Sequence, residues 1–281
     1  MNKELWNDLG IINLVLKENG LALKYVSQKF RNNKDVVLLA VKQNGLAIQY
    51  ASPELRNDTN IREIAKFVEE DIEFSFIPSG KIFDPLLKQY KKMEGFFISS
   101  HEIRRKIFES NLGYNPGTNQ TPNHPVNNIS MEDISRFLEF LNTKSGRLLY
   151  RLPTPEEWEY AAKANAKSTY FFGDDSSLMH DYAWYPFNAK GNSWPVGKKL
   201  PNQWGLYDIY GNLFERVALF PAQYYRGKGF RLPGLASKSL VPGLCSGSFE
   251  SVIVYCQPIT PDKNFSKRQN AIGFRVVRIL N

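Results

Sequence analysis

Apolar residues recur at helical spacing in the first 60 residues, and they do so as a repeat. The segment 16–32 (LKENGLALKYVSQKFRN) matches 41–57 (VKQNGLAIQYASPELRN), and a third, partial copy begins at Asn60. Each copy predicts two short helices around an Asn-Gly pair, since both residues readily adopt the positive φ that ends a helix. We expect stacked helices over residues 1–65 that bury their apolar faces against one another as a scaffold, with a partner-binding surface as the alternative.

After residue 70 the pattern changes to short apolar runs with two helices among them. Residues 74–83 and 95–99 are typical of strands. Helical periodicity returns at 130–142 behind a serine, and at 155–164 behind a threonine. From residue 170 onward, short apolar pieces alternate with Gly, Pro and Asn, and no long helical period appears. The sequence therefore predicts a loop-rich α+β domain over residues 72–281, preceded by the small all-α domain.

The composition fits a folded protein outside the membrane. Hydrophobic residues make up 42% and aromatic residues 14% of the 281 residues, which is enough for a buried core and excludes disorder as the main state. No apolar run approaches the ~18 residues of a membrane helix, and the N-terminus lacks the apolar stretch of a secretory signal. We expect a cytoplasmic protein without membrane insertion, although a specialised secretion system would leave no trace in the sequence.

The net charge of +8 is concentrated at the end of the chain. Residues 221–281 hold nine Lys and Arg against two Asp and Glu, a difference of +7. These cations are scattered over predicted loops without a recognition helix or an RNA-binding motif, which argues against nucleic acid as a partner. The charge favours a protein or another acidic ligand.

Five motifs occur in an order that is typical of one family. They are RLLYRLPTPEEWEYAAKA (147–164), YFFGDD (170–175), YAWYPFNAKGNSWPVGKKLPNQWGLYDIYGNLFE (182–215), GSF (247–249) and GFRVVR (273–278). Together they resemble the formylglycine-generating enzyme family, also called sulfatase-modifying factors. The resemblance implies a variant of the C-type-lectin fold whose ligand face is built by the C-terminal segment. The N-terminal repeat resembles a short tandem helical repeat domain of unknown function.

The first candidate for a ligand site is a calcium site. Asp208 and Glu215 stand seven residues apart with carbonyl-rich turns between them, and oxygen ligands of this kind suit Ca²⁺. The family resemblance implies that these two side chains bind the ion together with the backbone oxygens of Gly211 and Leu213. The alternative is a turn held by the Asp208 side chain, with Glu215 on the surface.

Catalysis in the family depends on a pair of cysteines that bind copper(I) and oxidise a substrate cysteine. Here Ser248 matches the family serine, but Ser251 occupies the first cysteine position and Cys256 the second. Because a hydroxyl group cannot replace a thiolate for copper(I), we do not expect a copper cofactor. Cys245, the other cysteine of the chain, stands where the family usually has an arginine, before the Gly-Ser pair.

The sequence also lacks the ligand residues for other metal and redox centres. Two cysteines cannot form a disulfide framework, a four-cysteine zinc site or an iron–sulfur cluster. Iron in the wider superfamily is held by His and Glu ligands, and the three histidines of this chain include no H-x₃-H pair.

The sequence thus favours a binding module that has lost the family's catalysis. Its contact surface is expected within residues 249–271, because aromatic and amide side chains on a rigid scaffold supply contact area and hydrogen bonds. The same fold carries the variable proteins of diversity-generating retroelements, whose hypervariable segment lies at this place. The alternative is a thiol-oxidising, formylglycine-generating type of oxidoreductase that uses Cys256. The expected contact residues are Phe249, Ser251, Ile253, Tyr255, Gln257, Lys263, Phe265, Lys267 and Arg268.

Overall fold

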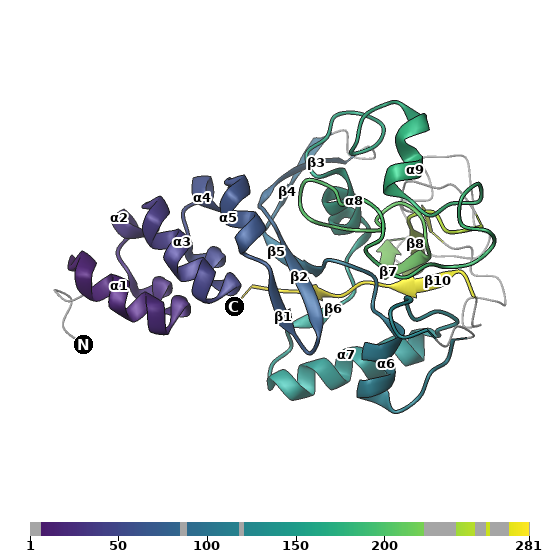
Figure 1. Ribbon diagram of the computed structural model, residues 1–281, viewed down its shortest axis with the longest axis horizontal. Coiled ribbons are helices and arrows are strands. Elements are labelled where there is room, and N and C mark those ends of the chain that lie inside the picture. Colours follow the sequence, from purple (N-terminus) through teal and green to yellow (C-terminus); the bar gives the residue numbers. More distant parts are fainter. Residues whose placement is uncertain are drawn as a thin grey trace.

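The structure, a computed structural model, describes residues 7–84, 89–117, 121–221, 240–250, 257–258 and 270–280. A small helical part at the N-terminal end leads into a larger part in which helices and loops surround two sheets (Figure 1). The C-terminal residues return to the side of the larger part that faces the helices (Figure 1). This arrangement confirms the predicted α+β fold with an all-α domain before it.

Asparagine side chains start the short helices of the repeat. Asn19 and Asn44 have extended backbones, with φ of −146° and −149°, and their side-chain oxygens accept from the N–H groups of Leu21 and Leu46. The helices expected before and after each Asn-Gly pair are confirmed, whereas the positive φ expected there is wrong. The elements are α1 (Leu9–Glu18), η2 (Gly20–Tyr25), α2 (Gln28–Arg31), α3 (Lys34–Gln43), η3 (Gly45–Tyr50), α4 (Pro53–Asn57) and α5 (Thr59–Ile64).

The glycines of the repeat allow close approach of two backbones. A Cβ at Gly20 would lie 2.2 Å from the carbonyl oxygen of Ala40, and a Cβ at Gly45 would lie 2.5 Å from that of Ala65. Any larger residue would force these segments apart. Each glycine therefore lets one repeat pack directly on the backbone of the next helix, and Gly45 does so where the helical part meets the larger part.

Two sheets and a hairpin organise the larger part. The first sheet has the strand order β1-β2-β5-β11-β6, the second has the order β10-β7-β8-β9, and β3 pairs with β4. Neighbouring strands are antiparallel except for β10 and β7, which are parallel. The strands are β1 (Phe67–Glu69), β2 (Ile72–Ile77), β3 (Gly80–Asp84), β4 (Gln89–Met93), β5 (Phe96–Ser99), β6 (Tyr150–Arg151), β7 (Phe214–Pro221), β8 (Leu240–Cys245), β9 (Gln257–Pro258), β10 (Ile272–Phe274) and β11 (Val277–Arg278).

The two predicted helices of this part are confirmed together with their caps. Ser130 and Thr154 each accept a hydrogen bond from the third residue of the helix, and the side chains of Asp133 and Glu157 reach back to the cap backbone. Among the described residues, no helix is long and apolar enough to cross a membrane. The helices are α6 (Arg105–Leu112), α7 (Met131–Ser145), α8 (Pro155–Lys163), η4 (Ser176–Leu178) and α9 (Met179–Tyr182). Of these, α6 was not predicted from the sequence.

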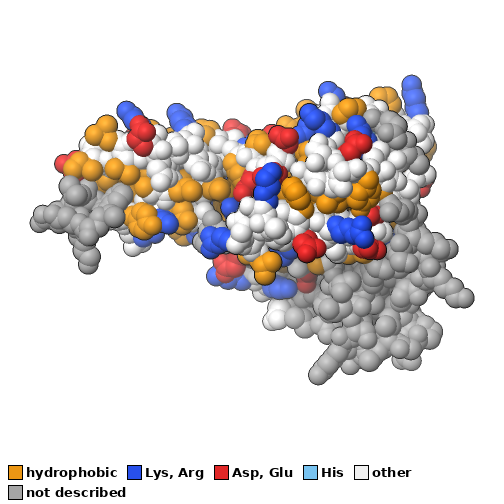
Figure 2. All heavy atoms as spheres, turned by 90° about the horizontal axis from the view of Figure 1, so that it is seen from below, with side chains coloured by type: hydrophobic (Ala, Val, Ile, Leu, Met, Phe, Trp, Pro, Cys, Tyr) orange, Lys and Arg blue, Asp and Glu red, His pale blue; other side chains and the backbone are white. Residues whose placement is uncertain are grey.

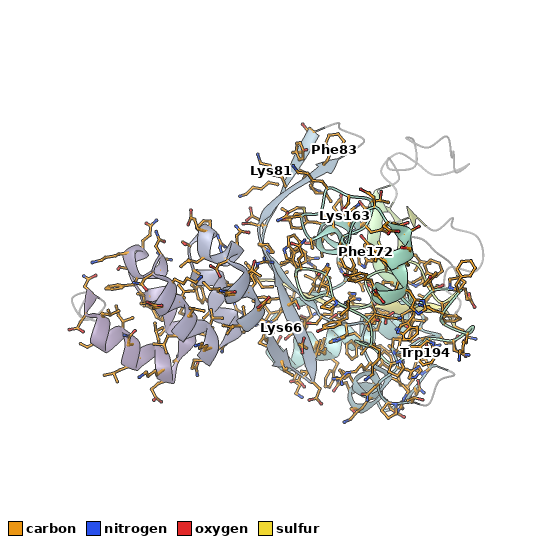
Figure 3. All side chains as sticks on the ribbon, turned by 45° about the horizontal axis from the view of Figure 1, so that its top comes forward. Lys66, Lys81, Phe83, Lys163, Phe172 and Trp194 are labelled. Carbon is orange, nitrogen blue, oxygen red and sulfur yellow. The ribbon has the colours of Figure 1, made fainter. Side chains whose placement is uncertain are left out.

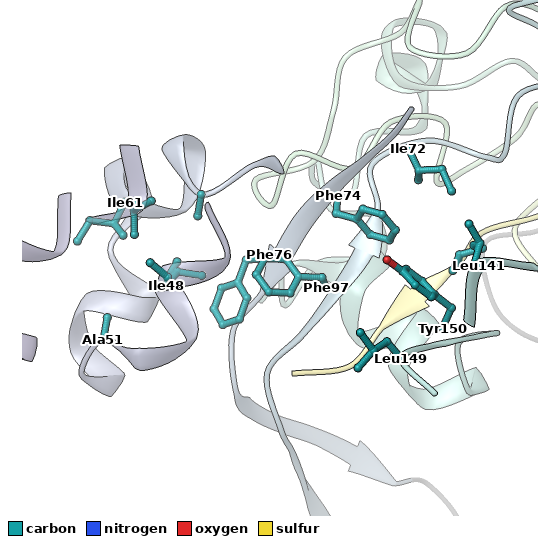
Figure 4. Close-up of a cluster of buried hydrophobic side chains, with 14 of the residues drawn as sticks. Ile48, Ala51, Ile61, Ile72, Phe74, Phe76, Phe97, Leu141, Leu149 and Tyr150 are labelled. Atoms are coloured by element: carbon teal, nitrogen blue, oxygen red, sulfur yellow. The ribbon is translucent and has the colours of Figure 1, made fainter. Parts of the chain in front are cut away.

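The helical part and the larger part share one hydrophobic core. Ile48 and Ile61 from the helices belong to the same buried cluster as Phe76 and Phe97 from β2 and β5 (Figure 4). A continuous core means that neither part can move without exposing apolar side chains. The repeat therefore acts at least as a scaffold that packs on its neighbour.

The hairpin of β3 and β4 projects from this core (Figures 1 and 3). Lys81 and Phe83 lie on it, and Phe83 contacts its cross-strand partner Tyr90 with ring centroids 5.5 Å apart. Both aromatic rings are largely exposed.

Replacing Gly45 tests whether close backbone contact holds the two parts together. We expect Gly45→Ala to destabilise the protein by about 1–3 kcal/mol, because its Cβ would meet the carbonyl oxygens of both Ala65 and Lys66. Gly10→Ala is the matched control, since a Cβ there meets only the Asp8 side chain, at 3.1 Å. Thermal unfolding measures both variants, and equal melting temperatures would contradict the proposed role of Gly45.

Candidate functional site

A buried arginine joins the segments around the predicted site. Arg275 is fully buried, and its Nε donates to Oε1 of Glu215 at 2.7 Å. Its Nη1 donates to the carbonyl oxygens of Ser99 and Ser100 at 3.1 and 2.9 Å, and its Nη2 donates to that of Tyr207. One side chain therefore connects β7, the end of β5 and the loop before β7.

Two buried glutamates extend this network. Glu215 accepts a second hydrogen bond, at 2.6 Å, from Nε1 of Trp158 on α8. Glu102 accepts from the side-chain amide of Asn212 at 2.7 Å and from the backbone N–H of Leu213 at 3.0 Å. The contacts fix the loop that carries the predicted calcium ligands against α8 and against the segment that follows β5.

That loop is tightly wound around Asp208 and Gly211. Asp208 has a φ of 53°, and its Oδ2 accepts from the N–H of Gly197 at 2.7 Å. Its Oδ1 is buried without a hydrogen-bond partner. Gly211 has a φ of 104°, and a Cβ there would lie 2.3 Å from the carbonyl oxygen of Trp184, so only glycine fits.

Acidic groups outnumber basic groups in this buried network. Burial raises the pKa of Asp208 to about 6, and burial also raises the pKa of Glu215 despite the opposing Arg275 guanidinium. Burial together with the nearby carboxylates of Asp208 and Glu215 raises the pKa of Glu102 well above its usual range. Three buried carboxyl groups thus face the single guanidinium of Arg275, and the excess negative charge is unfavourable in a low-dielectric interior.

Asp208 is the residue of this loop that could hold a cation, while the described residues contain no group of three or more His, Cys, Asp or Glu side chains suited to a metal. Asp208 offers a buried oxygen without a partner, and a cation would offset the excess negative charge. Both oxygens of Glu215 already accept a hydrogen bond, but each carboxylate oxygen has two lone pairs, so coordination remains open to it. The alternative of a surface Glu215 is wrong, because this side chain is fully buried.

The region that matches the family's catalytic segment is largely buried where the structure describes it. The Ser248 hydroxyl accepts from the N–H of Glu250 at 3.0 Å. Phe249 was expected to contact a ligand, but it is only 7% exposed and packs in a cluster with Leu213, beside Trp184 and Trp194. Phe249 therefore lies at the base of the expected contact surface as a packing residue.

The cysteine arrangement bears on the redox alternative. Cys245 at the end of β8 is buried and takes part in a disulfide. The chain has one other cysteine, Cys256, which lies outside the described residues. A sulfur in a disulfide is not a thiolate, so Cys245 in this state supplies no copper(I) ligand.

Most of the expected contact residues lie outside the described residues. Gln257 begins β9, where it pairs with Leu244 of β8. Its side chain is not described. The other expected contact residues lie outside the described residues: Ser251, Ile253, Tyr255, Lys263, Phe265, Lys267 and Arg268.

Two family descriptions match the chain. The sulfatase-modifying factor enzyme 1-like domain matches residues 64–280, and a domain of unknown function, DUF4116, matches residues 8–61. Among curated proteins, the formylglycine-generating enzyme of Mycobacterium tuberculosis is 28% identical in an alignment of 177 positions that covers 55% of this chain and 57% of that protein. The inactive Cα-formylglycine-generating enzyme 2 of Bos taurus is 28% identical over 126 residues, covering 41% and 40% of the two chains.

A further curated relative is the chaperone protein LppX of Paenibacillus barcinonensis, 25% identical over 44% of this chain and 61% of that protein. The chain therefore spans about three fifths or less of these relatives.

Solved structures share the fold of the larger part. Treponema denticola variable protein 1 superposes with a TM-score of 0.61 at 20% identity, over 76% of this chain and 98% of that one. PvdO from Pseudomonas aeruginosa gives a TM-score of 0.60 at 22% identity, with the same coverage. The family match covers most of the chain, and the predicted formylglycine-generating-enzyme type of C-type-lectin fold is confirmed. This chain belongs to the sulfatase-modifying factor enzyme 1-like family.

Proposed function

We propose that this chain is a catalytically degenerate binding module that recognises an acidic ligand through residues 249–271. The observation that carries the proposal is Ser251, at the position where the family has the first cysteine of its copper pair. Copper(I) needs soft thiolate ligands, and a hydroxyl group does not replace one. The disulfide at Cys245 points the same way, because it leaves that sulfur unable to act as a substitute thiolate.

The anchoring of the segment supports a role in binding. β7 pairs with β8 on one side and with β10 on the other, so the chain leaves the sheet and returns to it beside the same strand. The N–H of Phe249 donates to the carbonyl oxygen of Asn212, and Phe214 N–H donates to that of Ala271. Gln257 and Pro258 within the segment pair with β8 as β9. Other residues between the fixed ends can change without loss of the scaffold, as binding loops on rigid frames commonly do.

This anchoring also suits a variable protein of a diversity-generating retroelement, a role that would require variation confined to residues 249–271. The likeness to the Treponema variable protein shows the fold alone, and the relatives named as inactive enzymes show that the family includes members without the parent activity. These comparisons support the proposal by analogy.

Positive charge in and before the segment favours an acidic ligand. Residues 249–271 hold Lys263, Lys267 and Arg268 against Glu250 and Asp262, a net charge of +1, and residues 222–248 add four Lys and Arg with no acid. On the face drawn in Figure 2, acidic and basic side chains are interspersed over the described residues, and no large area has one sign of charge. A partner attracted by charge is therefore expected at the segment rather than on that described face.

Charge reversal in the segment tests the binding function. With a fluorescein-labelled oligoglutamate peptide as the probe, we expect the double variant Lys267→Glu/Arg268→Glu to weaken binding by about tenfold or more. Lys92→Glu, an exposed change on β4, is the control and should bind like the wild type. Stoichiometric copper(I) binding by the wild type, or oxygen consumption with a cysteine peptide that Cys256→Ser abolishes, would overturn the proposal in favour of an oxidoreductase.

Calcium is the proposed structural ion of this module. Asp208 and Glu215 would bind it with their side chains, and Gly211 and Leu213 with their backbone oxygens. The ion would neutralise the buried acids and so hold the loop that receives the Phe249 backbone. It would supply no redox chemistry.

Calcium removal tests this assignment. Adding Ca²⁺ to chelator-treated protein should stabilise the wild type by about 2.7 kcal/mol at a hundredfold excess over Kd, which is several degrees in Tm. Asp208→Ala should show no such shift, whereas Asp181→Ala, at an exposed acid outside the loop, should respond like the wild type. Metal analysis of the purified proteins provides a second readout. An equal response of all three proteins would contradict the site.

A further inference from the structure

One cleft among the described residues is lined by no residue of the segment 249–271. It has a volume of about 290 Å³ and lies between the β1–β2 turn, the segment that joins β5 to α6, and the loop 195–198. Pockets for drug-sized ligands are typically larger, so this cleft suits a smaller molecule. Its apolar lining is aliphatic and comprises Ile72, Ile103, Ile107, Pro195 and Val196.

The charged groups of the cleft include acids and bases that are not paired with one another. Asp71, Glu73 and Glu102 line it with carboxyl groups, and Arg104 and Lys198 line it with cationic groups. Glu102 is already bonded to Asn212 and Leu213. The Arg104 Nη2 donates to the backbone oxygen of Asp71 at 2.8 Å, but no ion pair joins Arg104 or Lys198 to a carboxylate among the described residues. Glu73 lies 3.5 Å from Nζ of Lys66, at the border with the helical part (Figure 3), whereas the Asp71 carboxylate has no partner within the described chain.

A neutral histidine forms part of the wall. Burial and the nearby Arg275 guanidinium lower the pKa of His101 to about 4, so the ring offers one donor and one acceptor at neutral pH. The ring stacks on Tyr207 with centroids 4.6 Å apart, and its Nε2 lies 2.7 Å from where a Cβ of Gly197 would be. Within the described residues, its ring nitrogens have no hydrogen-bond partner. His101 is therefore held in place but free to bond a ligand.

The rim of the cleft is built from the two-residue turn of the β1–β2 hairpin. Glu70 and Asp71 have φ of 53° and 60°, the positive values that a tight hairpin turn requires at both positions. Lys144 pairs with Glu70, and Arg104 binds the Asp71 carbonyl, so the turn is fixed from both sides. The turn thus places Asp71 at the cleft.

We propose that this cleft binds a free aliphatic α-amino acid. A simple anion would leave the Asp71 carboxylate unmatched, and a simple cation would leave Arg104 and Lys198 unmatched. A zwitterion can place its amine at Asp71 and its carboxylate at Arg104 and Lys198, and an aliphatic side chain suits the apolar part of the lining. This inference is independent of the proposed function, because none of these residues lies in the segment 249–271.

Calorimetric titration of the full chain with L-leucine tests the proposal. We expect L-leucine to bind, and we expect 4-methylpentanoate, which lacks the amine, and isopentylamine, which lacks the carboxylate, each to bind about tenfold or more weakly. N-acetyl-L-leucine amide, which carries neither charge, should not bind. If L-leucine gives no signal, or if the two singly charged analogues bind as tightly as L-leucine, the proposal is overturned.

Substitutions at two exposed residues, Lys198 and Asp71, test the cationic and the acidic side of the site separately. Lys198→Gln should weaken L-leucine and 4-methylpentanoate but not isopentylamine, and Asp71→Asn should weaken L-leucine and isopentylamine but not 4-methylpentanoate. Asparagine tolerates the positive φ at this turn, so Asp71→Asn should keep the wild-type Tm. Lys92→Gln, outside the cleft, should leave all affinities unchanged. Wild-type affinity for L-leucine in both cleft variants would show that it binds elsewhere and would refute the assignment.

Discussion

The ion pair of Arg275 and Glu215 is the interaction on which the larger part depends. A buried ion pair is stabilising only where hydrogen bonds satisfy the remaining groups, because the desolvation of both ions is costly. Here the guanidinium also bonds three backbone carbonyls, and the second oxygen of Glu215 is bonded by Trp158. Loss of either charge would leave the other buried without compensation, a change that typically costs about 3–5 kcal/mol.

The position of Arg275 in the chain explains why its side chain bonds segments of both sheets. It directly follows β10 of the four-stranded sheet and precedes β11 of the five-stranded sheet, so it lies where the chain crosses from one sheet to the other. Of the three carbonyls that it binds, those of Ser99 and Ser100 lie at the end of β5 and that of Tyr207 lies in the loop before β7. The same side chain thus fixes the two sheets relative to each other and fixes the strand to which the C-terminal segment returns.

Local features of the fold could be predicted from the sequence, while long-range ones could not. The caps at Ser130 and Thr154 act within three residues, and both helices follow from them. The hydrogen bonds of Glu102 to Asn212 and Leu213 join residues more than a hundred positions apart, and no local sequence pattern predicts them. Phe249 has the composition of a contact residue, yet its burial depends on Trp184 and Trp194, which lie far from it in sequence.

The network is separate from the positions on which the proposed loss of catalysis rests. Its members are Arg275, Glu215, Glu102, Trp158 and Asn212, and none of them occupies a position of the copper-binding pair. A serine at position 251 therefore removes a metal ligand without removing a bond of the network. In the binding role proposed above, residues between β8 and β10 outside β9 could therefore change while the network that joins the two sheets stays the same.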